Sequence, residues 1–242
     1  MADDVAVSDD ILLDQVRQLR QRGVPPKQIA RALGMSPAAV APLVRQVAEL
    51  DQVRSDPAER VLVGCWANPG WSRGLDLSSA PGWAATDPRG VDGSGTEGLV
   101  SILLARQDRA SRTTVCGFLV DVYCLGVKNA IGPLGMGVGS VDSYRGAYFR
   151  AYDVPGVPIP VEVAQHLVRG AVAYAHDLGF EPHADFAAAA QHLGVPTDPC
   201  PIRFGRDGKP FYVGGPYDDS RAILRTLDIT VGKGNYSFLT GL

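Results

Sequence analysis

The sequence predicts an α+β protein made of two units. A small unit of three helices comes first, and a larger unit follows in which an antiparallel sheet is backed by helices. Three observations lead to this prediction. Apolar residues recur at helical spacing over residues 10–50, and the polar stretch DQVRSDPAER at residues 51–60 is typical of a linker. Over residues 61–242, short apolar runs typical of strands alternate with longer segments of helical periodicity.

Turn and cap residues set the limits of the three predicted N-terminal helices. The first helix is expected over residues 10–22, after a frayed start. Pro26 and Pro37 suit the first turns of the second and third helices, where an amide hydrogen has no helical partner. Gly34 ends the second helix because glycine tolerates a positive φ, and Ser36 caps the third.

In the larger unit we expect strands and helices separated by irregular segments. The strands are expected at residues 61–66, 99–105 and 113–123, and the helices at 160–178, 185–193 and 218–230. Residues 67–98, rich in Gly, Pro, Ser and Asp, are predicted to be a mobile insertion or a functional loop. Residues 126–139 are predicted to be a flexible glycine-rich link, and residues 202–213 a hairpin.

Composition excludes several classes of protein. The net charge of −3 gives no global sign of a nucleic-acid binder, so any such case rests on local charge. The 4 cysteines form no CxxC pair, which argues against a zinc ribbon and a disulfide framework. The sequence shows neither the features of a signal peptide nor an apolar run long enough to span a membrane. We therefore expect a reduced, cytoplasmic protein without a membrane partner, cofactor or metal.

The N-terminal stretch resembles the helix-turn-helix family, in the simple three-helix form of resolvases and many bacterial regulators. The resemblance covers residues 10–50 and is carried by Ile29, Ala30, Leu33, Gly34, Ser36 and Val40. Two helices that cross steeply need a small residue at their closest approach, here Ala30, and a tight turn, here at Gly34. The resemblance implies DNA binding and transcription regulation, with the third helix in the major groove.

Local charge supports that implication. Residues 15–47 hold six basic and no acidic side chains. The residues predicted to contact nucleic acid are Arg17, Lys27, Arg31, Ser36, Arg45 and Gln46. Alanines on the third helix carry no base-reading group, and Pro42 interrupts its backbone bonding, so base reading is expected to be limited. The alternative is a module that binds a protein partner, a second copy of the chain or its own second unit.

The larger unit resembles a bacterial domain family of unknown function. The matching phrases are VDVYCLGVKNA (residues 120–130), GFEPHADF (179–186), FGRDGKPFYVGGPYDD (204–219) and TVGKGN (230–235). The group carries VDxYCLGVKD where this chain has Asn129, so a catalytic role of that acid would be lost here. The resemblance implies no activity.

The same phrases contain a candidate nucleophilic site. Cys124 lies at the end of a predicted buried strand and could form a nucleophilic triad with His183 and Asp185. Lys128 would lower the pKa of the Cys124 thiol. This site predicts a thiol-dependent hydrolase or transferase as the rival to DNA binding. The plain interpretations are a packed cysteine, a helix-capping Asp185 and a histidine in a rigid turn. The spacing does not favour a metal site.

Overall fold

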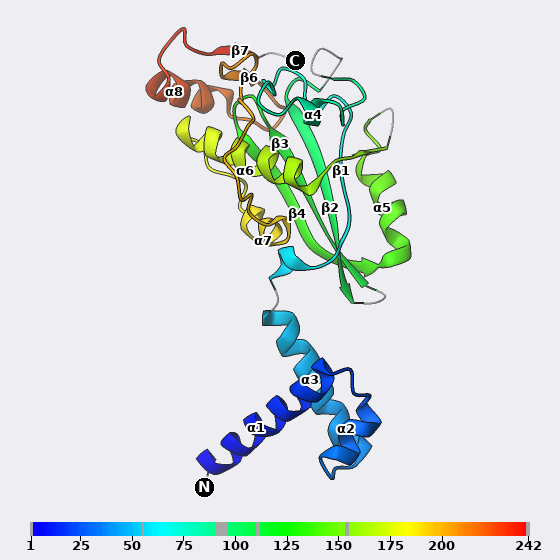
Figure 1. The fold of residues 1–242 in the computed structure, drawn as a ribbon. Helices are drawn as coiled ribbons and strands as arrows, with labels where there is room; N and C mark the ends of the chain where they lie inside the picture. Colours follow the sequence, from blue (N-terminus) through cyan, green and yellow to red (C-terminus); the bar gives the residue numbers. More distant parts are fainter. Residues whose placement is uncertain (1, 55, 91–95, 110–111, 153–154, 241–242) are drawn as a thin grey trace. The chain divides into compact units, whose positions relative to one another are not determined.

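A computed structural model gives the fold of the chain and describes residues 2–54, 56–90, 96–109, 112–152 and 155–240 (Figure 1). Contacts between residues divide it into two compact units, Met1–Asp56 and Pro57–Leu242. Within the described residues, no helix has both the length and the apolar character needed to cross a membrane.

The N-terminal unit consists of α1 (Ala2–Gln21), α2 (Pro26–Ala32) and α3 (Pro37–Arg54). All three helices contribute to its core, which comprises Leu13, Val16, Ile29, Ala30, Val40 and Val47. The prediction that the first helix begins at residue 10 is wrong. Residues 2–9 contain neither glycine nor proline, so nothing in them interrupts the helix. Likewise α3 continues through residues 51–54 of the stretch predicted as a linker.

The turn between α2 and α3 follows the expected chemistry. Gly34 has a φ of 65°, in the left-handed region that glycine adopts without strain. The Met35 amide donates to the Ala30 carbonyl at 2.9 Å, which closes α2 in a Schellman motif. Ser36 Oγ accepts from the Ala39 amide at 3.2 Å, so the predicted N-cap of α3 is confirmed.

The second unit contains a five-stranded antiparallel sheet with the strand order β4-β3-β2-β1-β5. Its strands are β1 (Leu62–Ala67), β2 (Leu99–Arg109), β3 (Arg112–Asp121), β4 (Gly126–Gly137) and β5 (Val157–Pro158). The helices are α4 (Pro81–Ala84), α5 (Val141–Tyr148), α6 (Val161–Asp177), α7 (Phe186–Leu193) and α8 (Ser220–Thr230), with 3₁₀ turns η1 (Pro57–Glu59) and η2 (Val138–Ser140). A separate parallel pair joins β6 (Phe211–Val213) to β7 (Ser237–Leu239). The α+β class and the antiparallel sheet are confirmed.

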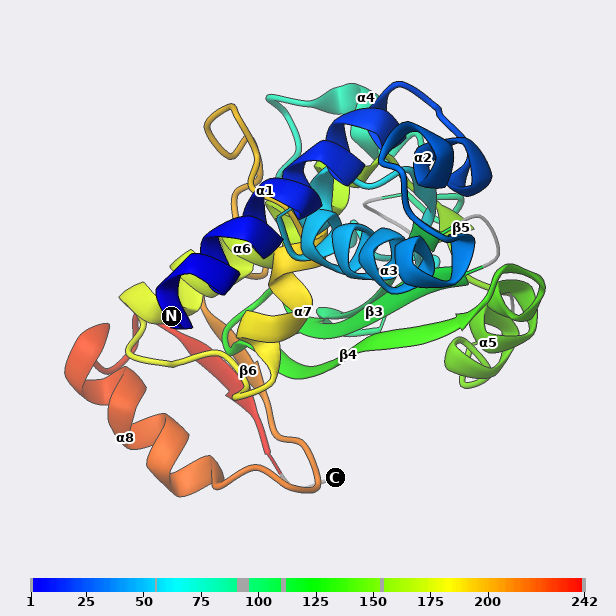
Figure 2. The ribbon, with the colours of Figure 1, turned by 90° about the horizontal axis from the view of Figure 1, so that it is seen from below.

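Helices cover the sheet on both faces (Figures 1 and 2). Ile102 of β2 pairs with Phe118 of β3, and both face the main core, to which α6 and α7 contribute Leu167 and Leu193. The neighbouring Leu103 points to the opposite face, where it packs in a smaller core with residues of α5. Because apolar side chains alternate toward two cores, these strands read as continuously hydrophobic in the sequence.

The prediction that the glycine-rich residues 126–139 form a flexible link is wrong, because most of them form β4. This strand lies at one edge of the sheet, where proline is tolerated because only one side of the backbone is paired. Gly132 is required by close approach: a Cβ at that position would lie 2.5 Å from the Val115 carbonyl oxygen. Gly132 is therefore explained by packing rather than by mobility.

The described part of the 67–98 segment packs against the main core of the second unit, to which it contributes Trp71. Trp71 is 1% exposed, and the carboxylate of buried Asp87 accepts hydrogen bonds from the Gly70 amide at 2.7 Å and from the Ser72 amide and hydroxyl at 3.0 and 2.8 Å. One buried acid thus satisfies several backbone groups of an irregular segment. Residues 91–95 lie outside the described residues.

The hairpin predicted at residues 202–213 is wrong apart from its turn. Asp207 and Gly208 both have positive φ, and Arg206 bridges to Lys209 across them. The flanking segments do not pair with each other, because Arg203 bridges to Asp76 and β6 pairs with β7. Sequence spacing identified the turn but not these distant partners.

Candidate functional site

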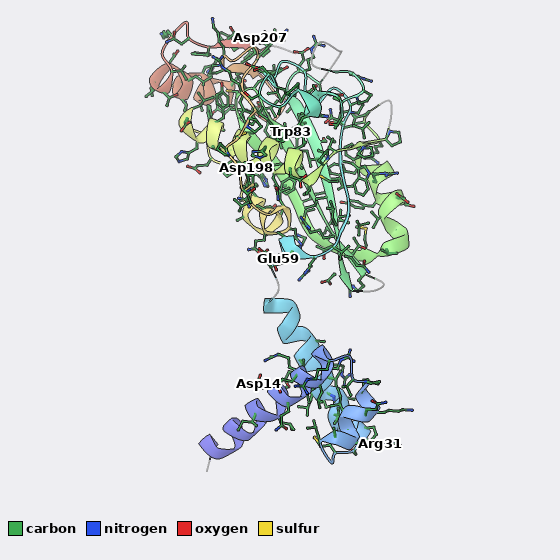
Figure 3. The ribbon with its side chains drawn as sticks, in the orientation of Figure 1. Asp14, Arg31, Glu59, Trp83, Asp198 and Asp207 are labelled. Carbon is green, nitrogen blue, oxygen red and sulfur yellow. The ribbon has the colours of Figure 1, made fainter. Side chains whose placement is uncertain are left out.

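Three of the cations predicted to contact phosphate lie on the solvent side of the N-terminal unit. Lys27 and Arg31 are exposed on α2, and Arg45 is exposed on α3; Figure 3 labels Arg31 at the surface of its helix. Among the side chains that the structure describes, no carboxylate lies within ion-pair distance of these three cations. Their charges are therefore available to neutralise an external anion.

Arg17 differs from these three cations because its side chain is already paired. Its Nη1 lies 2.6 Å from Asp14 Oδ1, and only 15% of its side chain is exposed. The charge of Arg17 is thus already balanced within α1, and phosphate contact would have to break that pair. Asp14 stands one residue before the acid-free window, so the window alone did not reveal the pair.

The outer face of α3 offers little to read a base edge. Its exposed residues after the first turn are Ala41, Pro42, Arg45, Gln46 and Ala48. Ser36 already uses its oxygen to cap the helix, although its hydroxyl proton remains free to donate. Among the residues of α3 whose side chains the structure describes, only Arg45 and Gln46 combine exposure with long hydrogen-bonding side chains on this face. Pro42 stays within the helix, which continues to Arg54.

Cys124 is packed in a hydrophobic core, where burial disfavours the charged thiolate. It is 0% exposed and lies in a cluster with Leu178, Tyr212 and Leu227. Burial raises the pKa of the Cys124 thiol far above its ordinary value, and the charge of Asp121 raises it further. Within the described residues its sulfur forms no hydrogen bond, with His183 or any other group. The packed-cysteine interpretation matches this environment.

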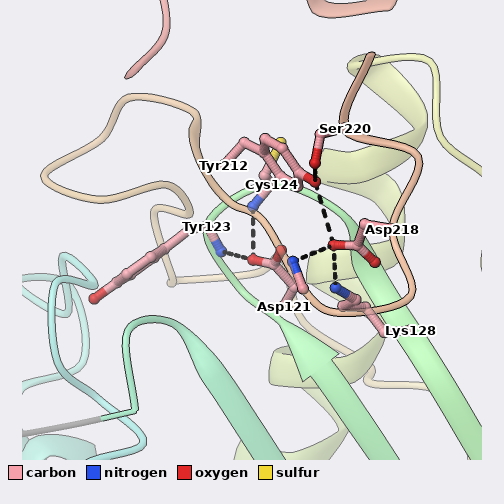
Figure 4. Close-up of polar contacts among 8 residues, drawn as sticks. Asp121, Tyr123, Cys124, Lys128, Tyr212, Asp218 and Ser220 are labelled. Carbon is pink, nitrogen blue, oxygen red and sulfur yellow. Dashed lines mark hydrogen bonds and ion pairs between the residues drawn. The ribbon is translucent and has the colours of Figure 1, made fainter. Parts of the chain in front are cut away.

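Lys128 is engaged by a different partner from the one predicted. Its Nζ lies 2.8 Å from Asp218 Oδ2, and both side chains are largely buried, with 19% and 12% exposed (Figure 4). The Lys128 charge does lower the pKa of the Cys124 thiol, but burial outweighs it. The same Asp218 oxygen accepts the Gly215 amide at 2.9 Å and the Tyr212 hydroxyl at 3.4 Å. Lys128 therefore ties β4 to the loop before α8.

His183 and Asp185 interact with each other at the start of α7. The Asp185 amide donates to His183 Nδ1 at 3.3 Å, and the Asp185 carboxylate lies 3.8 Å from the same nitrogen. Asp185 occupies the N-cap position but makes no capping bond, because its backbone is helical there rather than extended. Its predicted cap is thus wrong. The His183 amide donates to the Val127 carbonyl at 2.9 Å, which fixes the loop to β4.

Sequence reasoning missed Asp121, the most perturbed carboxyl of this region. It is 5% exposed, and one carboxylate oxygen accepts the amides of Tyr123 and Cys124 at 2.9 and 3.0 Å (Figure 4). Burial raises its pKa to about 6, against the lowering effects of these bonds and of Lys128. Its position in the phrase VDVYC, directly before a turn, was the available signal.

The four predicted catalytic residues consequently fall into separate arrangements rather than one reacting centre. Cys124 belongs to a core, Lys128 to an ion pair, and His183 with Asp185 to a surface turn. In the described part of the chain, no group of three or more His, Cys, Asp or Glu side chains is placed to hold a metal ion.

Comparison of the chain with protein-family models, with curated proteins and with solved structures found no match. The two sequence resemblances therefore stay predictions, and function has to be argued from the geometry and charge described above.

Proposed function

We propose that the N-terminal unit binds duplex DNA and that α2 and α3 act as a helix-turn-helix pair. The observation that carries this proposal is the exposure of Lys27, Arg31 and Arg45 on these two helices, without a carboxylate partner among the described side chains. Lysine and arginine that neutralise phosphates release condensed counterions, which favours binding at low salt. The second unit would then sense a ligand, dimerise or recruit a partner.

Weak sequence preference belongs to the proposal. Arg45 and Gln46 are the long polar side chains on the described outer face of α3, whereas Ala41 and Pro42 offer a base no hydrogen bond. Phosphate contacts fix the position of a protein on DNA without reading the sequence. We therefore expect affinity to depend far more on salt than on the sequence of the duplex.

The test is the salt dependence of binding to a labelled duplex, followed by fluorescence anisotropy. In the variant Lys27→Gln/Arg31→Gln/Arg45→Gln, three phosphate contacts are lost. The slope of log K against log salt should become shallower by about 2.7, because each contact contributes about 0.9. Binding should weaken uniformly across duplexes of different sequence, since the lost contacts are to the backbone.

The matched control is Lys209→Gln/Arg221→Gln/Arg225→Gln, which removes the same charge from exposed positions of the second unit. It should leave both affinity and slope unchanged. Absence of duplex binding at about 50 mM salt, an affinity insensitive to salt, or an equal loss in the control would contradict the proposal. Absence of duplex binding would favour the protein-interaction alternative for this unit.

A further inference from the structure

A pocket in the second unit is not explained by DNA binding. It has a volume of about 670 Å³ and lies between the segment around α4, the first turns of α6 and the loop of residues 195–201. This volume is in the range of small-molecule sites. Figure 3 labels Trp83 and Asp198, which line it from two different segments.

The charges of the pocket have one sign. Glu162 and Asp198 line it, and neither lysine nor arginine is among its lining residues. Both carboxylates are exposed enough to reach a ligand. Gln165 also lines the pocket, and its Nε2 donates to the Leu193 carbonyl at 2.9 Å. Its side-chain oxygen can therefore accept a hydrogen bond from a ligand. A bound molecule is therefore offered acceptors by all three side chains.

An aromatic wall completes the pocket. The rings of Trp83 and His166 lie 5.3 Å apart with an angle of 40° between their planes. His166 is 5% exposed, and its Nδ1 is buried without a hydrogen-bond partner among the described residues. Burial lowers the pKa of His166, against the opposing charge of Asp198, so the ring adds no positive charge that would repel a cation.

The rim of the pocket is stiff. Pro196, Pro199 and Pro201 line it from the 195–201 loop, and Pro160 lines it at the start of α6. Proline restricts the backbone before any ligand arrives, so less ordering is required on binding. The proline rings also add apolar surface to the lining of the pocket.

We propose that this pocket binds an organic cation, namely an amine carried on an apolar body. The ammonium group would be held by Glu162, Asp198 and the Gln165 oxygen, and the apolar body would lie against Trp83, which also attracts positive charge through its ring face. The inference does not depend on the proposed DNA binding, because every residue that it uses belongs to the second unit.

The test compares two probes of similar shape and opposite charge, 2-phenylethylamine and 3-phenylpropionate, by calorimetry on the full chain. The amine should bind at least about tenfold more tightly than the carboxylate. Tryptophan fluorescence should report the same binding, because Trp83 lines the pocket whereas Trp66 and Trp71 are 7% and 1% exposed. Equal binding of the two probes, or no binding of the amine, would overturn the proposal without any variant.

Variants then locate the site. Glu162→Gln/Asp198→Asn should weaken amine binding by about tenfold or more, and added salt should weaken wild-type binding. The control Asp177→Asn/Glu181→Gln neutralises two exposed acids that do not line the pocket, and it should change nothing. An equal loss in both variants would show that the amine follows overall charge, which also overturns the assignment. Duplex binding is measured separately, so a failure of the amine-binding proposal can be distinguished from a failure of the DNA-binding proposal.

Discussion

Among single residues, burial raises the pKa of two side chains: Asp121, the last residue of β3, and Cys124 in the turn that follows. Burial disfavours the thiolate of Cys124, which is the form that a thiol-dependent enzyme would use as its nucleophile. Asp121 is different, since burial raises its pKa only to about 6 from the ordinary 3.8. Its protonation therefore changes within an accessible pH range, and the free energy of unfolding must follow it.

The sign of that dependence can be worked out from the direction of the shift. Because the folded state binds the Asp121 proton more tightly than the unfolded state, the proton stabilises the fold at low pH. This contribution is lost as pH rises from about 4 through about 6. Asp218 acts oppositely: burial alone would raise its pKa, but hydrogen bonds from Lys128 and Gly215 hold it below the ordinary value. Its contribution is lost as pH falls.

The variant Asp121→Asn isolates the first effect, since asparagine keeps an acceptor for the Tyr123 and Cys124 amides. We expect the advantage of wild type over the variant in free energy of unfolding to shrink by about 2 kcal/mol between pH 4 and pH 7. Urea unfolding at a series of pH values measures it. An advantage that grows with pH would show that the shift has the opposite sign.

At the level of elements, the helix limits were predictable where one residue decides them, and the pairing of strands was not. Gly34 and Ser36 act on their own immediate neighbours, so sequence was enough to place the turn between α2 and α3. β4 was missed because its glycines and proline suit an edge strand only when a partner, here β3, is known. β6 was likewise assigned to a hairpin, although its partner β7 lies far along the chain.

Pro42 gives a prediction about α3. The helix continues past it, so the Ala38 carbonyl has no amide from residue 42 to accept. Pro42→Ala restores that bond and removes the ring, at the expense of a more flexible unfolded chain. We expect the N-terminal unit to gain about 2 kcal/mol of stability. Hydrogen exchange of the α3 amides in the full chain measures the gain.

Pro37→Ala is the matched control, because Pro37 is at the first position of α3, where no helical bond is missing. It should leave stability unchanged or lower it slightly. If Pro42→Ala also left stability unchanged or lowered it, the destabilisation that we assign to Pro42 inside α3 would be contradicted.

For the whole molecule, each unit has its own core. Among the described side chains, the core of the N-terminal unit runs from Leu13 to Val47, whereas the clusters of the second unit begin at Cys65. The candidate site was harder to predict than this division. Basic residues show in the sequence, and the i,i+3 spacing of Asp14 and Arg17 allows their pair in α1. The Lys128–Asp218 pair and the pocket at His166 depend on contacts that spacing does not encode.

Separate cores predict that the second unit folds without the first. A chain of residues 57–242 should keep the thermal transition that this unit shows in the full protein, followed by circular dichroism. It should also keep its preference for 2-phenylethylamine, because every residue lining the pocket is retained, and it should lose binding to duplex DNA. Duplex binding that survived the truncation would move the nucleic-acid site out of α2 and α3. Loss of the transition would mean that the cores, although separate in their residues, depend on each other for stability.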